Sequence, residues 1–142
     1  MSISYLIAVD GSEPALRAVE HVIRDAADRR TPVNIDLVNV QAPLPNDVTR
    51  FVDNQTVADF HREAGDIAMA AARQKLTEAG MAYTCHLLIG DAAPALANFA
   101  KDKGCSMIVM GAHGFGHVVG LFMGSVTVKV VQLSKLPVLL IK

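Results

Sequence analysis

The chain has 142 residues, of which 51% are hydrophobic and 19% charged, and its formal net charge is −1. This length suits one compact domain, so we expect residues 1–142 to form a single domain that buries a core without disulfides or a structural metal. The composition excludes disorder as the main state. A near-neutral charge without a basic run argues against a nucleic-acid partner.

Cysteine usage and hydropathy indicate the compartment. Cys85 and Cys105 form neither a CxxC motif nor a multi-cysteine framework, so we interpret both as small buried hydrophobes in a reducing environment. The first ten residues lack the basic region and cleavage site of a signal peptide, and no apolar run approaches the ~20 residues of a membrane span. We therefore expect a cytoplasmic protein without a membrane partner.

The first third of the chain is predicted to be strand, helix, strand. Ile3–Val9 is a short apolar run typical of a buried strand, and Ser12 with Pro14 predicts the start of a helix over Glu13–Arg29. A second strand is predicted over Ile35–Val40. The long connection that follows, Gln41–Thr56, has the length of a lid or binding loop.

The same alternation continues to the end of the chain. The remaining predicted elements are a helix over Val57–Ala79, a strand over Tyr83–Ile89, a helix over Ala92–Lys103, a strand over Met107–Met110, a helix from Val126 and a strand over Val138–Ile141. Such alternation is typical of an α/β fold in which helices cover both faces of an open, doubly wound parallel sheet. We expect a Rossmann-like or flavodoxin-like architecture.

In an open α/β sheet, ligands bind outside the carboxyl ends of the strands. Here the predicted strands end at Asp10, at Val40 with Gln41, at Gly90 with Asp91, and at Gly111. The connection that follows the last of these strand ends is the richest in glycine, with five glycines from Gly111 to Gly124. Glycines let the backbone approach a ligand closely, and Gly124-Ser125 before a helix offers free N–H groups and a hydroxyl. These groups suit a phosphate chain.

The glycine segment is neither a Walker loop nor a GxGxxG motif. Its spacing of Gly111, two residues, Gly114, nine residues and Gly124-Ser125 resembles the signature of the universal stress protein family, in its nucleotide-binding branch. Three further segments resemble that family: residues 8–12, 90–92 and 136–141. The resemblance implies five strands in the order 3-2-1-4-5, a homodimer, and a bound adenine nucleotide, usually ATP, with a divalent metal such as Mg or Mn beside the phosphates.

The resemblance also implies residue roles. By position, Asp10 would make polar contacts with the ribose or with the metal, and the Val40 backbone would face adenine. The other implied contacts are Met110, Gly111, His113 and Gly114 along ribose and phosphates, and Gly124, Ser125, Val126 and Thr127 around the phosphate tail. Ala112 departs from the polar or basic residue often found there. Asp10 has an equally plausible structural role, which is to cap the helix that follows it.

The charges indicate what this site does. Residues 107–128 contain no Lys or Arg, so a metal must balance the phosphates, and the cations that speed phosphoryl transfer are missing. We therefore predict an ATP-binding stress-response regulatory module with at most slow hydrolysis. The alternative is a nucleotide-hydrolysing or adenylating enzyme on the same fold. A phosphorylated receiver domain is disfavoured because Asp10 has no acidic neighbour before it.

Other candidate sites are weaker. Glycines around His113 and His117 argue against a helical zinc pair, and Cys85 and His86 should face opposite sides of a strand, which disfavours a nucleophilic pair. The cluster of Asp59, His61, Glu63 and Asp66 is interpreted as a solvated helix face.

The last predicted strand, Val138–Ile141, should lie at a bare apolar edge of the sheet. Such an edge favours pairing with another strand. We expect a homodimer through this strand.

Overall fold

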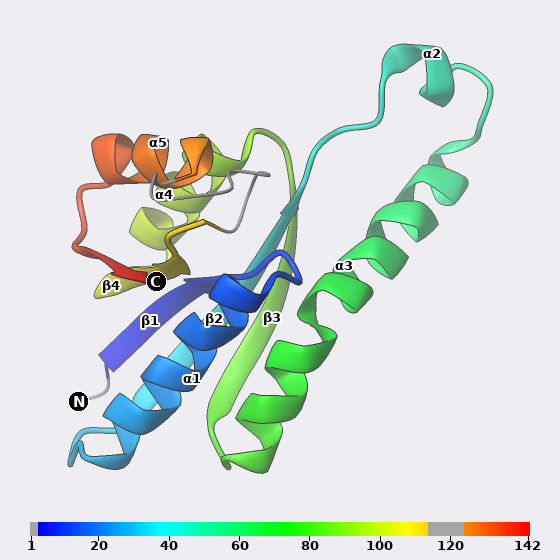
Figure 1. Ribbon diagram of the computed structural model, residues 1–142. Helices are drawn as coiled ribbons and strands as arrows, with labels where there is room; N and C mark the ends of the chain where they lie inside the picture. The colour runs from blue at the N-terminus through cyan, green and yellow to red at the C-terminus, as the bar shows by residue number, and fades with distance from the viewer. Residues whose placement is uncertain (1–2, 114–123) are drawn as a thin grey trace.

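The computed structural model describes residues 3–113 and 124–142 and contains a five-stranded parallel sheet between two layers of helices (Figure 1). The elements are β1 (Ile3–Ala8), α1 (Glu13–Ala27), β2 (Val33–Gln41), α2 (Asn46–Thr49), α3 (Asn54–Glu78), β3 (Ala82–Ile89), α4 (Ala92–Asp102), β4 (Met107–Gly111), α5 (Ser125–Leu133) and β5 (Val138–Ile141). The strand order is β3-β2-β1-β4-β5. The predicted α/β class and strand order are confirmed.

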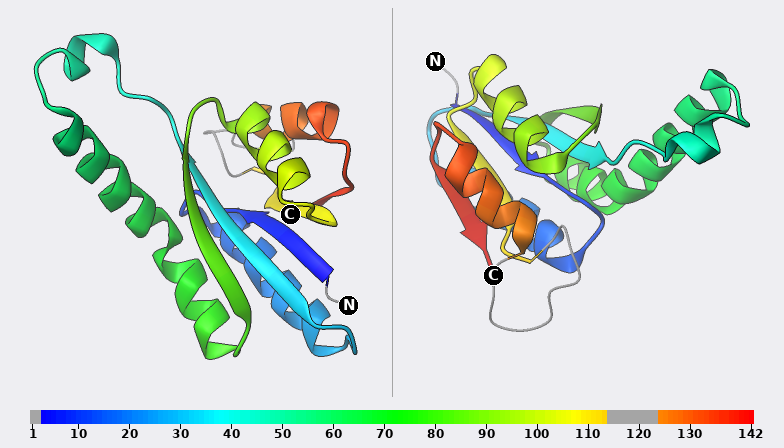
Figure 2. Two further views of the ribbon diagram at one scale, coloured as in Figure 1. Left: turned by 180° about the vertical axis from the view of Figure 1, so that it is seen from behind. Right: turned by 90° about the horizontal axis from the view of Figure 1, so that it is seen from above.

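The sheet separates two hydrophobic cores because alternate residues of its central strand point to opposite faces. In β1, Tyr5 and Ile7 pack against helices α1 and α3, whereas Leu6 and Ala8 pack against α4 and α5. The two helix layers are seen on either side of the sheet in Figure 2. This double cover explains why β1, β4 and β5 have nearly continuous apolar sequences rather than alternating ones.

The long connection after β2 differs from the prediction. It contains a short helix, α2, and the following helix begins at Asn54 rather than at Val57. The earlier start follows from a cap: the Asp53 side chain accepts a hydrogen bond from Thr56 N at 2.7 Å. This bond lowers the pKa of Asp53. Helix α2 and the first turns of α3 extend beyond the sheet (Figure 1).

One residue of the predicted solvated face of α3 is buried. His61 is only 5% exposed, and its Nδ1 atom has no hydrogen-bond partner among the described residues. Its ring lies edge-on to that of Phe60, with centroids 5.5 Å apart. The interpretation of His61 as a solvated residue was therefore wrong, while Asp59, Glu63 and Asp66 are exposed as predicted.

A polar cluster around Asp36 lies in the amino-terminal half of the sheet, on the α4 side. Asp36 is 8% exposed, and its Oδ1 atom lies 2.7 Å from His86 Nε2 and 3.9 Å from Lys103 Nζ. The Ser4 hydroxyl donates to Oδ2 at 3.4 Å, and the Cys105 thiol donates to the same atom at 3.7 Å. We call these five residues the Asp36 cluster.

Both cysteines are free thiols, and burial raises the pKa of each. The expectation that both are buried hydrophobes holds only in part, because Cys85 is half-buried and the buried Cys105 donates a hydrogen bond to Asp36. Cys85 packs against the α1–α3 core, while the ring of its neighbour His86 lies on the other face of the sheet, tilted by 55° against the ring of Phe99 of α4, with centroids 4.7 Å apart. The prediction that Cys85 and His86 face opposite sides is confirmed.

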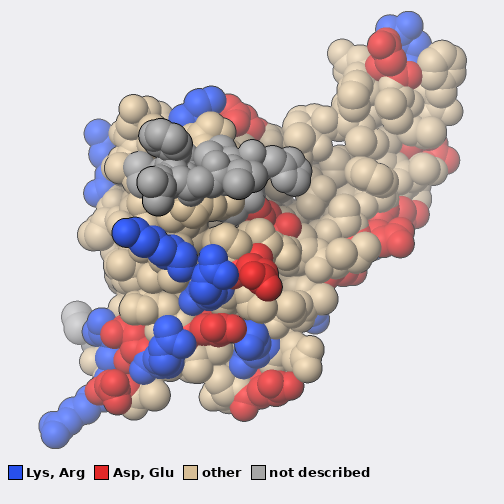
Figure 3. Space-filling view, in the orientation of Figure 1, with Lys and Arg blue, Asp and Glu red and all other residues tan. Residues whose placement is uncertain are grey.

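The surface gives two further observations. On the face drawn in Figure 3, positive and negative side chains are mixed rather than gathered into one basic patch. Among the described residues, none of the helices is both long enough and apolar enough to cross a bilayer.

Candidate functional site

A cavity of about 640 Å³ opens at the carboxyl edge of the sheet. It lies where the ends of β1, β2 and β3 meet the first turns of α4 and α5. The lining residues are Asp10, Val40, Ala42, Pro43, Gly90, Asp91, Ala92 and Val126. Three of the predicted site residues, Asp10, Val40 and Val126, are thus brought together from three separate elements. The position agrees with the rule that ligands bind outside the carboxyl ends of parallel strands.

Asp10 has a structural role in addition to its place in the cavity. Its Oδ1 atom accepts a hydrogen bond from Ser12 N at 2.9 Å, which closes the turn at the left-handed Gly11 (φ 86°). The cap of α1 itself is made by the Ser12 hydroxyl, which accepts from Ala15 N at 3.4 Å. Asp10 therefore shapes the turn, and the helix does not depend on its carboxylate for a cap.

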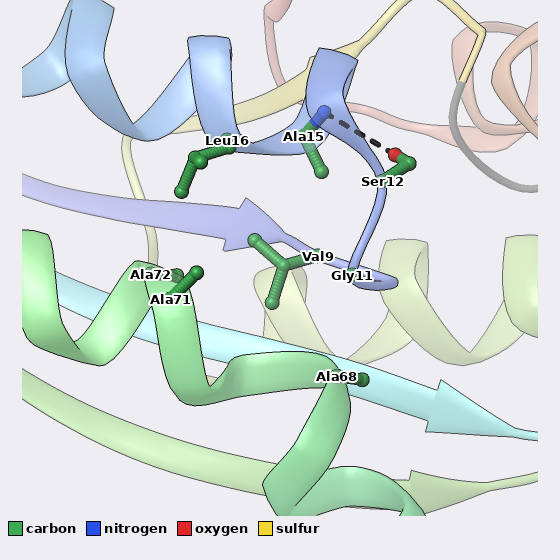
Figure 4. Close-up of a pocket in the computed structure, with 8 residues that line it drawn as sticks. All are labelled: Val9, Gly11, Ser12, Ala15, Leu16, Ala68, Ala71 and Ala72. Carbon is green, nitrogen blue, oxygen red and sulfur yellow. Dashed lines mark hydrogen bonds between the residues drawn. The ribbon is translucent and has the colours of Figure 1, made fainter.

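A second, much smaller cavity lies under the same turn (Figure 4). Its volume is about 30 Å³, and helices α1 and α3 line it largely with alanines. A cavity of this size holds a water molecule or two at most. Between these two cavities, only the larger one has room for a nucleoside.

Two predicted site residues have side chains buried in the protein interior. Met110 is fully buried in the core beneath α4 and α5. Thr127 is fully buried as well, and its hydroxyl donates to the Gly111 carbonyl at 3.4 Å. Any contact from these two residues to a ligand would therefore come from their backbone rather than from their side chains.

The two described glycines of the signature differ in their surroundings. A Cβ atom at Gly111 would lie 2.6 Å from the carbonyl carbon of Pro14, so the packing of β4 against α1 requires glycine there. At Gly124 a Cβ atom would meet no described atom closer than 3.8 Å, and its φ of −64° suits any residue. Within the described part of the chain, nothing explains a glycine at position 124. Gly114 lies outside the described residues.

The amino end of α5 has no side-chain cap among the described residues. Gly124 occupies the N-cap position and has no side chain to cap the helix. Within the described part of the chain, the N–H groups of the first turn, starting with the exposed Ser125, therefore lack the side-chain partner that capping supplies. Together with the partial positive charge of the helix end, these donors can bind an anion.

His113 adds an unpaired buried atom at the same edge. Its Nδ1 atom is buried and has no hydrogen-bond partner among the described residues. Buried polar atoms are almost always paired in native proteins, so the partner of this atom has to come from outside the described residues, either from the rest of the chain or from a ligand.

The charge of the described lining is negative. Asp10 and Asp91 line the cavity, and no Lys or Arg does so among the described residues. In residues 3–113 and 124–142, no group of three or more His, Cys, Asp or Glu side chains could hold a metal ion. A divalent cation at this edge would consequently need ligands that come with the bound molecule.

Residues 4–142 match the Universal stress protein family. The chain belongs to this family. It is 28% identical to the universal stress protein YxiE of Bacillus subtilis, over 96% of this chain and 97% of the relative. The solved structure of the Methanocaldococcus jannaschii family member MJ0577 superimposes with a TM-score of 0.81 at 27% identity, covering 100% of this chain and 96% of that one. An Arabidopsis thaliana family member solved with AMP bound has a TM-score of 0.69 at 21% identity, covering 99% and 91%.

Sequence reasoning missed part of the lining. Asp91 was recognised as a strand exit but not as a site residue, and Ala42, Pro43 and Ala92 were not singled out. The strand-exit rule was the signal that could have found Asp91 and Ala92, because they lie two and three residues after the end of β3.

Proposed function

We propose that this universal stress protein family member binds an adenine nucleotide at the carboxyl edge of its sheet and serves as a regulatory module of the stress response. The observation that carries the proposal is the cavity of about 640 Å³, lined by the ends of three strands and by the first turn of α5. In the Arabidopsis thaliana family member the same fold holds AMP, which supports the choice of ligand class.

The nucleotide is oriented by the two kinds of group at this edge. The phosphates lie at the amino end of α5, where, among the described residues, no atom crowds Gly124 and no side chain caps the first-turn N–H groups. The nucleoside occupies the cavity along Val40, with the Asp10 carboxylate beside the ribose, where it can accept hydrogen bonds from neutral donors. The roles of Gly111, His113, Gly114, Ser125, Val126 and Thr127 at the phosphate end belong to the same proposal.

ATP with Mg²⁺ or Mn²⁺ is the ligand we propose. Mg²⁺ is commonly held by one or two carboxylates together with substrate phosphates and water, so a prebuilt three-residue site is not needed. Asp10 is the carboxylate placed to join such an ion. The cation would neutralise the phosphates in a segment without Lys or Arg.

Binding rather than rapid catalysis is the proposed activity. A lysine or an arginine finger is the usual source of fast phosphoryl transfer, and residues 107–128 contain neither. We expect single-turnover hydrolysis slower than about once per second. Faster turnover would favour a nucleotide-hydrolysing or adenylating enzyme instead.

Two measurements test the ligand. Mass spectrometry of small molecules released from gently purified protein should detect an adenine nucleotide. Calorimetric titration of the emptied protein with ATP, with and without Mg²⁺, should give saturable binding that the metal strengthens. Absence of binding under both conditions would refute the proposal.

We further propose a cytoplasmic homodimer that forms through β5. This strand is an edge of the sheet, its residues are only half-buried, and the apolar Val131 and Leu133 of neighbouring α5 are exposed. Sedimentation velocity at micromolar concentration should show a dimer. A monomer at that concentration would contradict this part of the proposal.

A further inference from the structure

The helices of this chain differ in how their N-cap side chains are used. Ser12 accepts from Ala15 N at the start of α1, and Asp53 accepts from Thr56 N at the start of α3. In both helices the donor is the third helical residue, the usual partner of an N-cap. Asp91 occupies the N-cap position of α4 and makes no such bond.

The sequence of α4 explains why Asp91 makes no cap bond. The helix begins Ala92-Ala93-Pro94, so its third residue is a proline. Proline has no N–H group, and the preferred donor to an N-cap carboxylate is therefore missing. Pro94 leaves Asp91 as a carboxylate that the helix does not use, and Asp91 lines the large cavity.

The position of Asp91 along the sheet indicates which part of a ligand it meets. The strand order places the exits in the row Asp91, Val40, Asp10 and Gly111, from β3 to β4. Neighbouring strands are about 4.8 Å apart, so the β3 exit lies roughly 14 Å from the β4 exit, which leads to the phosphate end. Asp91 is thus at the end of the row opposite the phosphates, where the base would lie.

A carboxylate at that end can only accept hydrogen bonds when ionised. It favours a base that presents an amino group and disfavours one that presents a carbonyl oxygen. We propose that Asp91 is a specificity-determining residue, which accepts a hydrogen bond from the exocyclic amine of the base and so selects 6-aminopurine over 6-oxopurine nucleotides. This inference rests on the proposed nucleotide site and names its base selectivity.

Four variants test the proposal by titration with ATP and with inosine triphosphate, whose base carries an oxygen in place of the amine. We expect wild type to prefer ATP by about tenfold, the effect of one charge-assisted hydrogen bond. Asp91→Ala should reduce the preference to less than about twofold. Pro94→Ala should reduce it as well, because the restored N–H of residue 94 recruits Asp91 as a cap. The double variant Asp91→Ala/Pro94→Ala should resemble Asp91→Ala.

The fourth variant, Asp53→Ala, is the matched control because it removes an N-cap aspartate that does cap its helix. It should lower the melting temperature and leave the ATP preference unchanged. Asp91→Ala should leave the melting temperature nearly unchanged, since no cap bond is lost.

The outcomes separate this inference from the proposed function. Wild type that binds neither nucleotide would refute the nucleotide site and the selectivity with it. Wild type that binds ATP while Asp91→Ala keeps the full preference would refute only the role of Asp91. A loss of discrimination against 2′-deoxy-ATP in Asp91→Ala, with the preference over inosine triphosphate retained, would place Asp91 on the sugar and overturn the assignment to the base.

Discussion

Two groups of polar side chains lie at opposite ends of the sheet and differ in how they are paired. At the amino-terminal end, the carboxylate of Asp36 has partners on strands β1 and β3 and in the segment between α4 and β4, including His86 at 2.7 Å. At the carboxyl edge, Asp91 makes no cap bond and His113 Nδ1 has no partner among the described residues. Buried polar groups are almost always paired in folded proteins, so the partners of the buried Asp36 carboxylate are part of what holds the fold together. Asp91 is exposed and is not used by its own helix.

The largest expected effect comes from breaking the paired group. Asp36→Ala leaves His86 and Lys103 without their shared carboxylate, so we expect the free energy of unfolding to fall by about 3 kcal/mol. Urea denaturation measures this loss, and Asp102→Ala, at an exposed residue of α4, is the control with a loss under about 0.5 kcal/mol. Affinity for ATP should not change. A strong loss of ATP affinity in the folded variant would mean that the two ends of the sheet are not separate.

Gly111→Ala should have the next largest effect. The added methyl group would meet the backbone of Pro14 at 2.6 Å, and neither strand β4 nor helix α1 can yield without disturbing the core. We expect a loss of about 2 kcal/mol, within the range of overpacked sites. Chemical denaturation measures it. Unchanged stability would show that this glycine of the signature serves a ligand and not the packing.

A smaller loss is expected where a cap is removed at the carboxyl edge. Ser12→Ala removes the acceptor for Ala15 N, and the long 3.4 Å distance of that bond predicts a loss of about 0.5 kcal/mol. Ser12→Asp, which keeps a capping oxygen, should restore the stability. Thermal unfolding of the three proteins distinguishes the cap from a general effect of the substitution.

The smallest effect on stability, and the clearest effect on binding, is expected at Gly124. A methyl group there would meet no atom of the described residues closer than 3.8 Å, so Gly124→Ala should change the free energy of unfolding by less than about 0.5 kcal/mol. It should weaken ATP binding about tenfold, because the methyl group stands where the phosphates approach the α5 amino end. Calorimetry and urea denaturation of the same sample measure both values. Unaltered ATP affinity would remove Gly124 from the site.

The fold was readable from the sequence because each buried strand is a short apolar run and each helix carries start and stop residues. The strand order came from the family resemblance, and the structure confirms it. The Asp36 cluster was not predicted, since its members come from residues 4, 36, 86, 103 and 105 and meet only through strand pairing and the end of α4. Local patterns carry no information about such contacts.

The candidate site was predicted in part. The strand-exit rule and the resemblance found Asp10, Val40 and Val126, which line the cavity. The resemblance could not tell that the side chains of Met110 and Thr127 point into the core, because that depends on helix packing. The missing cap bond of Asp91 could have been inferred from the sequence, since a proline three residues after an N-cap has no N–H group to donate to the cap, regardless of the fold.

The tight contact at Gly111 has a mechanical consequence. The Thr127 hydroxyl binds the Gly111 carbonyl, and Gly111 in turn rests on Pro14 with no free space between them. These contacts join the first turn of α5 to the first turn of α1 through a single residue of β4. On the same helix α1, Arg17 Nε donates to the carbonyl of Lys142 at 3.0 Å, so α1 also fastens the end of the chain just beyond β5.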